Sequence, residues 1–211
     1  MKTYKFNDNT QLTAHFNVSE FRCKCGQAHD TKLDEALVQK LEQLYAALNC
    51  SKIIVNSGYR CTAHDKNVGG NGYGQHTKGT AADIVCYDKD GKKISSKIVC
   101  CAAQDIGFGG IANIDGTYTA THIDTRTSLK WYGDEVVTSS YSVTNDFYSY
   151  FKLGKNDVYG EKKVYSVTDK SDVKALQNAL NAKGFGCGSA DGIIGSNTVK
   201  AMFNALCSYL M

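Results

Sequence analysis

Residues 75–86 read Gln-His-Thr-Lys-Gly-Thr-Ala-Ala-Asp-Ile-Val-Cys, and this stretch carries the densest chemical signal of the sequence. Its second half, 81–86, is a short apolar run closed by the Asp-Lys-Asp-Gly turn at 88–91, which predicts a buried strand. Asp83 lies inside that strand, where a bare charge is costly to bury. We therefore expect its carboxylate to be paired or bound to a metal.

The segments before this strand are simple to interpret. Residues 32–49 carry apolar side chains at three- and four-residue intervals, which predicts an amphipathic helix, with Thr31 as its N-cap and Asp34 three residues later. Residues 53–56 form a β-branched run, which predicts a strand. The glycine-rich segment 69–74 predicts a loop that can wrap around a ligand.

After the strand, residues 95–105 predict a second helix. Two further strands are expected at 108–114 and 118–123, joined by the Asp-Gly turn at 115–116. Helices and strands follow no steady βαβ rhythm, so the α+β class fits best. Residues 141–167 are polar, with scattered aromatic residues and weak periodicity, which indicates a linker that could contain a hairpin.

The last forty or so residues, 168–211, form a separate module. One helix face is expected to carry Val173, Leu176, Leu180 and Phe185. A second is expected to carry Thr198, Ala201, Met202, Leu206 and Leu210. This pattern is typical of a small helical bundle. The chain then divides into a main domain over 1–140, a linker over 141–167 and this module.

Composition excludes several functions. Of the 211 residues, 42% are hydrophobic and 21% charged, so the chain can bury a core. No apolar run reaches the about 18 residues of a membrane span. The net charge is +3, from scattered rather than clustered basic residues, which argues against nucleic acid as a partner. The start, 1–8, has no apolar signal segment, so we expect a protein made in the cytoplasm. We also expect a monomer.

The strongest chemical pattern joins His76 and Asp83 to His122, far downstream. Two histidines and one carboxylate form a catalytic zinc set, because such sites use three protein ligands and leave the fourth position to water. The alternative is that His76 is a surface loop residue, Asp83 caps a turn and His122 is a satisfied strand histidine. Spacing alone leaves both open.

The chain has nine cysteines, an odd number, and no framework of exported disulfides is apparent, so we expect mostly reduced thiols. Cys23, Cys25 and His29 could form a structural metal site if Cys61 or His64 comes close. The alternative, which we favour at this stage, is that the thiols pack as small hydrophobic groups.

Several separated motifs occur together in order. They are Ser57-Gly58-Tyr59-Arg60, Val68-Gly69-Gly70, Gln75-His76-x-x-Gly79-x-Ala81-x-Asp83-Ile84 and His122-Ile123-Asp124-Thr125-Arg126. Over residues 15–132 the chain resembles the zinc D-alanyl-D-alanine carboxypeptidase-like (M15) family of peptidoglycan peptidases. The resemblance implies a small catalytic domain with a mainly antiparallel sheet, a Zn²⁺ ion bound by His76, Asp83 and His122, and cleavage of peptide bonds in cell-wall stem peptides.

The resemblance also implies roles for two residues around the metal. Arg60 would clamp a substrate carboxylate, a task that suits a planar guanidinium; the alternative is a surface arginine stacked on Tyr59. Gln75 would hydrogen-bond the substrate backbone or the developing oxyanion.

The general base is where this chain departs from the family pattern. Many relatives carry Glu or Asp three residues before the last zinc histidine, but here that residue is Thr119. Asp124, two residues past His122 and on the same strand face, is the first candidate. Asp115 is the second. Asp124 could instead orient His122 or pair with Arg126.

The C-terminal module has a motif of its own. Its elements are Val173-x-x-Leu176-Gln177-x-x-Leu180-Asn181-x-x-Gly184-Phe185 and Asp191-Gly192-Ile193-Ile194-Gly195-x-x-Thr198-x-x-Ala201. It resembles the peptidoglycan-binding domain of three short helices, which implies tethering to the wall and a higher local concentration of the peptidase there. The leading hypothesis is a phage endolysin. A host autolysin and a non-catalytic wall-binding protein are the alternatives.

Overall fold

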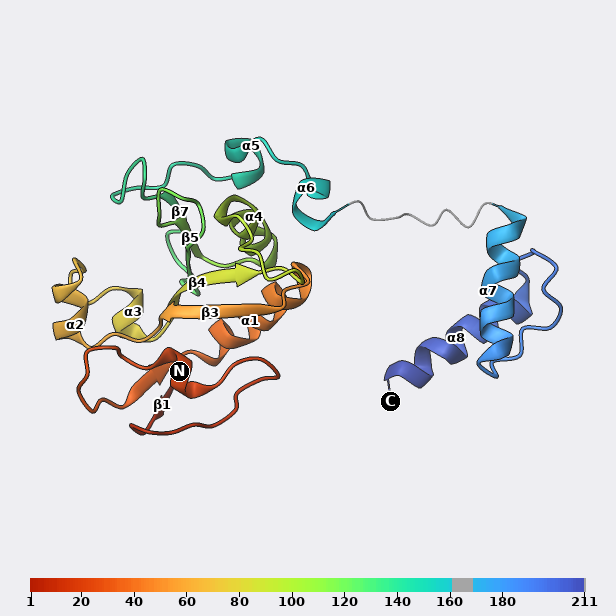
Figure 1. Ribbon diagram of the computed structural model, residues 1–211, viewed down its shortest axis with the longest axis horizontal. Coiled ribbons are helices and arrows are strands. Elements are labelled where there is room, and N and C mark those ends of the chain that lie inside the picture. Colours follow the sequence, from red (N-terminus) through yellow and green to blue (C-terminus); the bar gives the residue numbers. More distant parts are fainter. Residues whose placement is uncertain (161–168, 211) are drawn as a thin grey trace. The chain divides into compact units, whose positions relative to one another are not determined.

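The computed structural model describes residues 1–160 and 169–210, and the chain divides into two compact units, 1–161 and 162–211. The first unit combines helices with a sheet, and the second is helical in its described part (Figure 1). The predicted α+β class is confirmed. Within the described residues, no helix has both the length and the apolar character that crossing a membrane requires.

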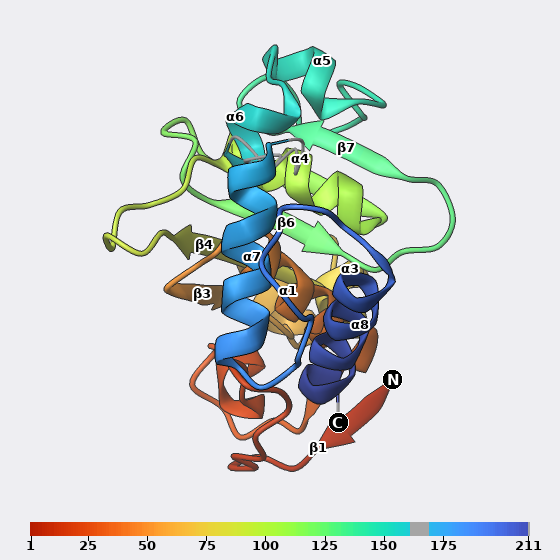
Figure 2. The same cartoon turned by 90° about the vertical axis from the view of Figure 1, so that its right-hand side faces the viewer.

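The main sheet of the first unit has the strand order β3-β4-β6-β5-β7. Its strands are β3 (Lys52–Ser57), β4 (Ala81–Tyr87), β6 (Thr121–Asp124), β5 (Gly110–Asn113) and β7 (Trp131–Asp134). Neighbours pair antiparallel except β5 and β7, which run parallel, so the prediction of a mainly antiparallel sheet is confirmed. Figure 2 shows β3, β4, β6 and β7 following one another across the unit. A separate pair joins β1 (Lys2–Tyr4) to β2 (Thr31–Leu33).

The sheet has one apolar face and one polar face, because side chains alternate along each strand. The buried side chains of the apolar face include Val55, Ala82, Ile84, Ile111, Ile123 and Tyr132. On the other face, Asp83 of β4 lies directly opposite His122 of β6. His122 in turn lies opposite the small Ala112 of β5. The polar face therefore brings the predicted metal ligands together, while the other face builds the core.

Two long helices, α1 (Glu35–Ala47) and α4 (Ser96–Ile106), pack beside each other on the apolar face (Figure 1). Both were predicted. The N-cap of α1 is Asp34, whose side chain accepts a hydrogen bond from the Ala36 amide, and not Thr31 as predicted. Thr31 lies in β2, paired with Tyr4, because the chain forms a strand before it enters the helix.

Part of the predicted linker belongs to the first unit. Helices α5 (Phe147–Phe151) and α6 (Lys155–Tyr159) pack against α4, and Phe147 and Val158 join the hydrophobic core. These short helices bury aromatic side chains that the weak periodicity of the segment did not reveal. The remainder of the predicted linker, 161–167, lies outside the described residues.

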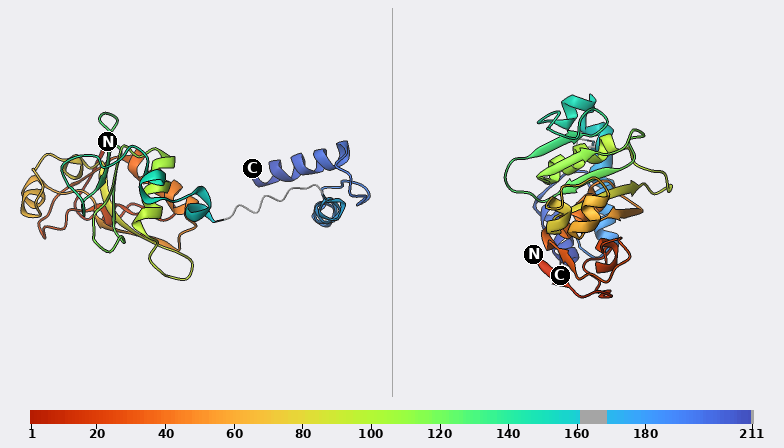
Figure 3. Two further views of the ribbon diagram at one scale, coloured as in Figure 1. Left: turned by 90° about the horizontal axis from the view of Figure 1, so that it is seen from above. Right: turned by 90° about the vertical axis from the view of Figure 1, so that its left-hand side faces the viewer.

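Two short helices, α2 (Thr62–Asn67) and α3 (Gln75–Lys78), lie beside the polar face. The 3₁₀ helix η1 (Val18–Phe21) contacts β2 and β3, and its Val18 and Phe21 belong to the hydrophobic core. Helices α2 and α3 lie near the end of β3 and the start of β4 (Figure 3), and the predicted loop 69–74 joins them. Gly79 ends α3 with a φ of +79°, and a Cβ there would lie 2.3 Å from the Lys32 carbonyl oxygen. Only glycine fits this turn, which places α3 above the sheet.

In the second unit the described residues form two helices, α7 (Lys170–Ala182) and α8 (Ser196–Leu210), where the resemblance implied three. Gln177 fastens the intervening loop to α7. Its buried amide donates to Asp191 Oδ1 at 2.9 Å and to Thr198 Oγ1 at 3.1 Å, and accepts from the Gly192 amide at 2.9 Å. The loop is therefore held by hydrogen bonds rather than by a helix of its own.

The inner face of α8 differs from the predicted one. Thr198 and Ala201 are buried as expected, but Met202 and Leu206 are exposed, while Ala205 packs on the module's core. Small residues at positions 198, 201 and 205 let α8 approach closely, which turns the larger apolar side chains outward.

Gly110 is a tightly packed position on the polar face of the sheet. It lies opposite Asp124, and a Cβ there would lie 2.0 Å from Asp124 Oδ2. Overpacking of this kind typically costs about 1–3 kcal/mol. We expect Gly110→Ala to lower the free energy of unfolding by about that amount in denaturant titration. Gly116→Ala is the matched control, since a Cβ there meets no atom within 4 Å. Equal stabilities of the two variants would contradict this packing.

Candidate metal centre

Three side chains from α3, β4 and β6 converge on one point of the polar face. His122 Nδ1 lies 2.9 Å from Asp83 Oδ1, and His76 Nε2 lies 3.2 Å from both of these atoms. Ligand atoms about 2.0–2.1 Å from a tetrahedral zinc ion lie about 3.3 Å from one another. The triangle of donors therefore fits one face of a zinc tetrahedron.

Both histidines are oriented by a partner on the ring nitrogen that faces away from this point. His76 Nδ1 donates to the Gly58 carbonyl oxygen at 2.7 Å. His122 Nε2 donates to Asp124 Oδ2 at 3.2 Å. With a metal bound, each of these bonds would fix the tautomer that leaves a lone pair on the converging nitrogen, the usual arrangement around a histidine metal ligand.

The second oxygen of Asp83 is held by an arginine. Arg60 Nη2 donates to Asp83 Oδ2 at 2.5 Å, its Nη1 donates to Asp65 Oδ1 at 3.3 Å, and its Nε donates to Ser57 Oγ at 2.8 Å. A β-bulge between Val55 and Ser57 brings Ser57 opposite Asp83, which places it within reach of Arg60. The carboxylate therefore presents only Oδ1 to the metal position.

The charges of the centre depend on one another. Burial opposes ionisation of Asp83, but hydrogen bonds from His122 and His76 hold its pKa far below the usual range. Burial also opposes protonation of His122, but its bonds to Asp124 and Asp83 raise its pKa to about 9. In the metal-free protein at neutral pH, His122 is therefore protonated, and a metal ion would replace that proton as the positive charge between the two carboxylates.

A cavity of about 490 Å³ opens over the three donors. Its wall includes the predicted residues Arg60 and Gln75, together with Arg126, Trp131 and Glu135. Gln75 Oε1 accepts from Thr80 Oγ1 at 2.8 Å, so the amide nitrogen of Gln75 is the group that can donate to a bound molecule.

Asp124 has the environment of an orienting residue. Its side chain is fully buried, and it is not among the residues that line the cavity. Besides His122 it accepts from Arg126, whose Nη2 lies 2.5 Å from Oδ2. Burial opposes its ionisation, yet the bonds from His122 and Arg126 hold its pKa well below the usual range. These are the two contacts of the alternative that the sequence left open.

Asp115 and Thr119 also lie outside the cavity wall. Asp115 accepts hydrogen bonds from the hydroxyls of Thr117 and Thr119, both at 2.7 Å, so it stabilises its own turn.

Glu135 is the carboxylate that sequence reasoning missed. It follows β7 directly and lines the cavity beside His122 and Asp83. Desolvation at the cavity raises its pKa, although the nearby His122 partly offsets this. The sequence carries little sign of its role. Strand β7 has only four residues, which is too short for an alternating pattern to show that Glu135 follows a strand.

The fold and this donor set together are those of a metallopeptidase. The family model for peptidase M15 matches residues 14–124, more than half of the 211 residues, so the chain belongs to the peptidase M15 family. Peptidases of this family are zinc-dependent, and the donor triangle of His76, Asp83 and His122 fits that metal. Comparison with curated proteins gave no match.

The pKa of His122 gives a direct test of the centre. In the chelator-treated protein, NMR titration of the ring should give a pKa of about 9. Asp124→Asn removes an anionic acceptor, so the pKa should fall toward the ordinary value of about 6.5. Asp115→Asn is the control and should leave it unchanged, because Asp115 bonds only to its own turn. An unperturbed His122 in the parent protein would refute this electrostatic picture.

Proposed function

We propose that this chain hydrolyses peptide bonds in the stem peptides of bacterial peptidoglycan. The observation that supports this most is the cavity built over a complete zinc donor set in a member of the peptidase M15 family. A zinc ion held there would supply polarisation of the scissile carbonyl and activation of a water molecule. The remaining chemistry falls to the residues of the cavity wall.

Glu135 is our candidate for the general base, in place of Asp124 and Asp115. It is the wall carboxylate that no arginine engages among the described contacts, whereas Asp83 and Asp65 both bond Arg60. A carboxylate whose pKa is raised accepts a proton more readily near neutral pH. Glu135 would take the proton of the attacking water and pass it to the leaving amine.

Substrate binding falls to hydrogen-bond donors in the cavity wall. The amide of Gln75 would donate to the substrate carbonyl. Arg60 and Arg126 give the cavity positive charge, which suits a substrate that carries carboxylates, as stem peptides do. Arg60 would clamp such a carboxylate while its Nη2 holds Asp83 in place. The indole of Trp131, whose ring centroid lies 5.6 Å from that of His122, closes one side.

The C-terminal unit would tether the enzyme to the cell wall. The loop that Gln177 holds against α7 lines another cavity, of about 280 Å³, and Asp191 and Ser196 are among its lining residues. This cavity and the motif resemblance support a peptidoglycan-binding module. A peptidase joined to such a module fits wall lysis by an endolysin. A host autolysin would have the same chemistry, and genome neighbourhood separates the two.

Digestion of purified peptidoglycan tests the activity. The zinc-loaded protein should release stem-peptide fragments, detected by mass spectrometry, whose masses identify the bond cut. His122→Ala loses a zinc ligand and should release none. If neither protein releases fragments but both sediment with the wall, the chain is a binding protein on a peptidase fold and the proposed activity is wrong.

Substitution of Glu135 tests the general base. Glu135→Gln keeps the shape of the side chain but cannot accept the proton, so kcat should fall by about 10²–10⁴-fold. The rate of the parent enzyme should rise with pH through the raised pKa of Glu135, and this acid limb should vanish in the variant. Zinc content, measured alongside, should be unchanged.

Asp115→Asn is the matched control and should retain full activity. If Glu135→Gln stays fully active while Asp124→Asn loses activity with its zinc retained, then Asp124 is the base and the assignment of Glu135 is wrong.

A further inference from the structure

A second group of potential metal ligands lies outside the catalytic cavity. The sulfurs of Cys23, Cys25 and Cys61 all lie within 4.8 Å of one another, and each cysteine is half-buried and unpaired. None of them lines the cavity. Sulfur ligands of a tetrahedral zinc ion, at about 2.3 Å from the metal, lie about 3.8 Å apart. Small rotations of these side chains would therefore close the group around one ion.

Each sulfur also receives a backbone amide. The Cys61 amide donates to Cys23 Sγ at 3.3 Å, and the Gln27 amide donates to Cys25 Sγ at 3.4 Å. The His64 amide donates to Cys61 Sγ at 3.4 Å. Amide donors favour the thiolate, which is the form that binds metal. Thiols that only fill a core need no such donors.

The backbone is shaped to present these sulfurs. Gly26 has a φ of +79°, and this turn directs the Gln27 amide back to Cys25. Cys61 is the N-cap of α2. His64 is the third residue of α2, and the side chains of the N-cap and third residues of a helix lie on the same side. Its ring nitrogens are not within 4.8 Å of all three sulfurs, so a side-chain rotation would be needed to bring the imidazole to the same ion.

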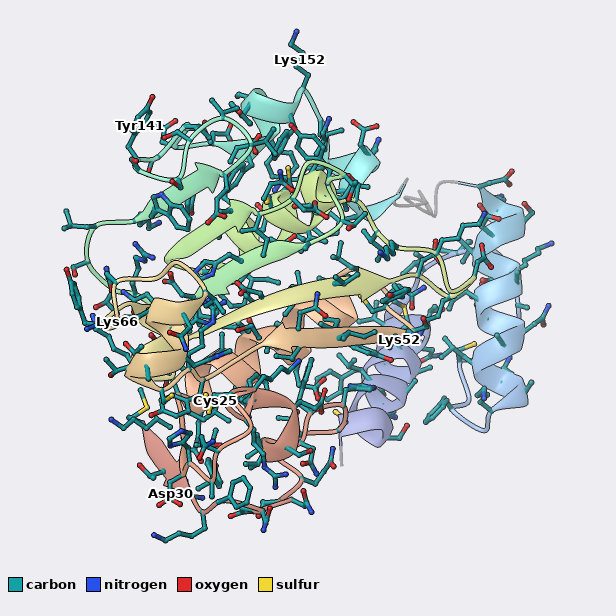
Figure 4. The ribbon with its side chains drawn as sticks, turned by 60° about the vertical axis from the view of Figure 1, so that its left-hand side comes forward. Cys25, Asp30, Lys52, Lys66, Tyr141 and Lys152 are labelled. Carbon is teal, nitrogen blue, oxygen red and sulfur yellow. The ribbon has the colours of Figure 1, made fainter. Side chains whose placement is uncertain are left out.

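The segment that carries Cys23 and Cys25 is fixed beside α2 (Figure 4). The Tyr59 amide donates to the Phe21 carbonyl at 2.8 Å. Lys24 Nζ donates to the carbonyls of Asn56 at 2.6 Å and Val55 at 3.2 Å. The ammonium group of Lys24 therefore lies at β3. These hydrogen bonds hold the segment that carries Cys23 and Cys25 against the segment that leads to Cys61.

We propose that Cys23, Cys25, Cys61 and His64 form a second, structural zinc site. Three soft sulfur donors and one imidazole suit a closed tetrahedral zinc site rather than a catalytic one, because no position remains for substrate. The site would fasten the N-terminal segment to residues 57–61. That stretch carries the Gly58 carbonyl, which orients His76, and Arg60, which holds Asp83.

Metal content tests this site in the full-length protein, purified under reductant, stripped with chelator and reloaded with zinc. The parent protein should hold about two zinc ions per chain. His122→Ala and Cys61→Ser should each hold one, and the double variant none. Cys207→Ser removes a thiol from the C-terminal unit and is the matched control, with zinc content unchanged.

Cobalt substitution gives a test that does not require a cysteine variant to fold. In His122→Ala loaded with cobalt, the second site should produce an intense sulfur-to-cobalt charge-transfer band in the near ultraviolet, which a site of two histidines and an aspartate cannot produce. His64→Ala should weaken cobalt binding at least tenfold. His29→Ala, the control histidine of the same region, should not.

Absence of the charge-transfer band in cobalt-loaded His122→Ala would overturn the proposal. So would a disulfide mapped between two of Cys23, Cys25 and Cys61 by peptide mass spectrometry under non-reducing conditions, because those thiols could then not bind the metal. If the band persists but His64→Ala binds cobalt as tightly as His29→Ala does, the assignment of His64 as the fourth ligand is wrong. Each of these results can be obtained whether or not the protein cleaves peptidoglycan.

Discussion

The antiparallel register of β4 against β6 is the constraint on which the rest of the site depends. It puts Asp83 directly opposite His122 and Ala81 opposite Asp124. A slip of one residue would turn every side chain of a strand to the other face, so Asp83 would enter the apolar core and Ile84 would face the cavity. The same strand register therefore buries Ile84 on one face and brings the metal ligands together on the other.

Buried charge is tolerated here because each carboxylate of the centre has a cationic partner. Asp83 bonds Arg60, and Asp124 bonds Arg126. His122 lies between the two carboxylates and contacts both. Removing one member of such a network leaves an uncompensated buried charge, which costs more than the pair contributes to stability. The side chains of the centre are therefore held in place without a metal, and the proton on His122 supplies part of the positive charge that a metal ion would bring.

A close approach between two backbone segments positions the acceptor for His76. Gly58 packs against the backbone of Phe21, where a Cβ would lie 2.7 Å from the Phe21 Cα. The carbonyl of Gly58 then faces His76. Because Cys61 and Arg60 follow within three residues, the N-terminal segment, the thiol group and the metal centre share one short stretch of backbone.

The sequence by itself predicted the α+β class, four of the five strands of the main sheet and the two long helices, because hydrophobic periodicity is a local signal. Its ordered motifs also indicated His76, Asp83 and His122 as candidate metal ligands. The sequence did not predict the helices within residues 141–160, because Phe147 is recognisable as a core residue only when it packs against α4. Only tertiary structure distinguished the carboxylates. Asp124 and Glu135 look equally able to accept a proton in the sequence, yet the fold buries the first between His122 and Arg126 and places the second in the cavity wall. The environment of a titratable group is set by residues distant in the chain, which no local pattern encodes.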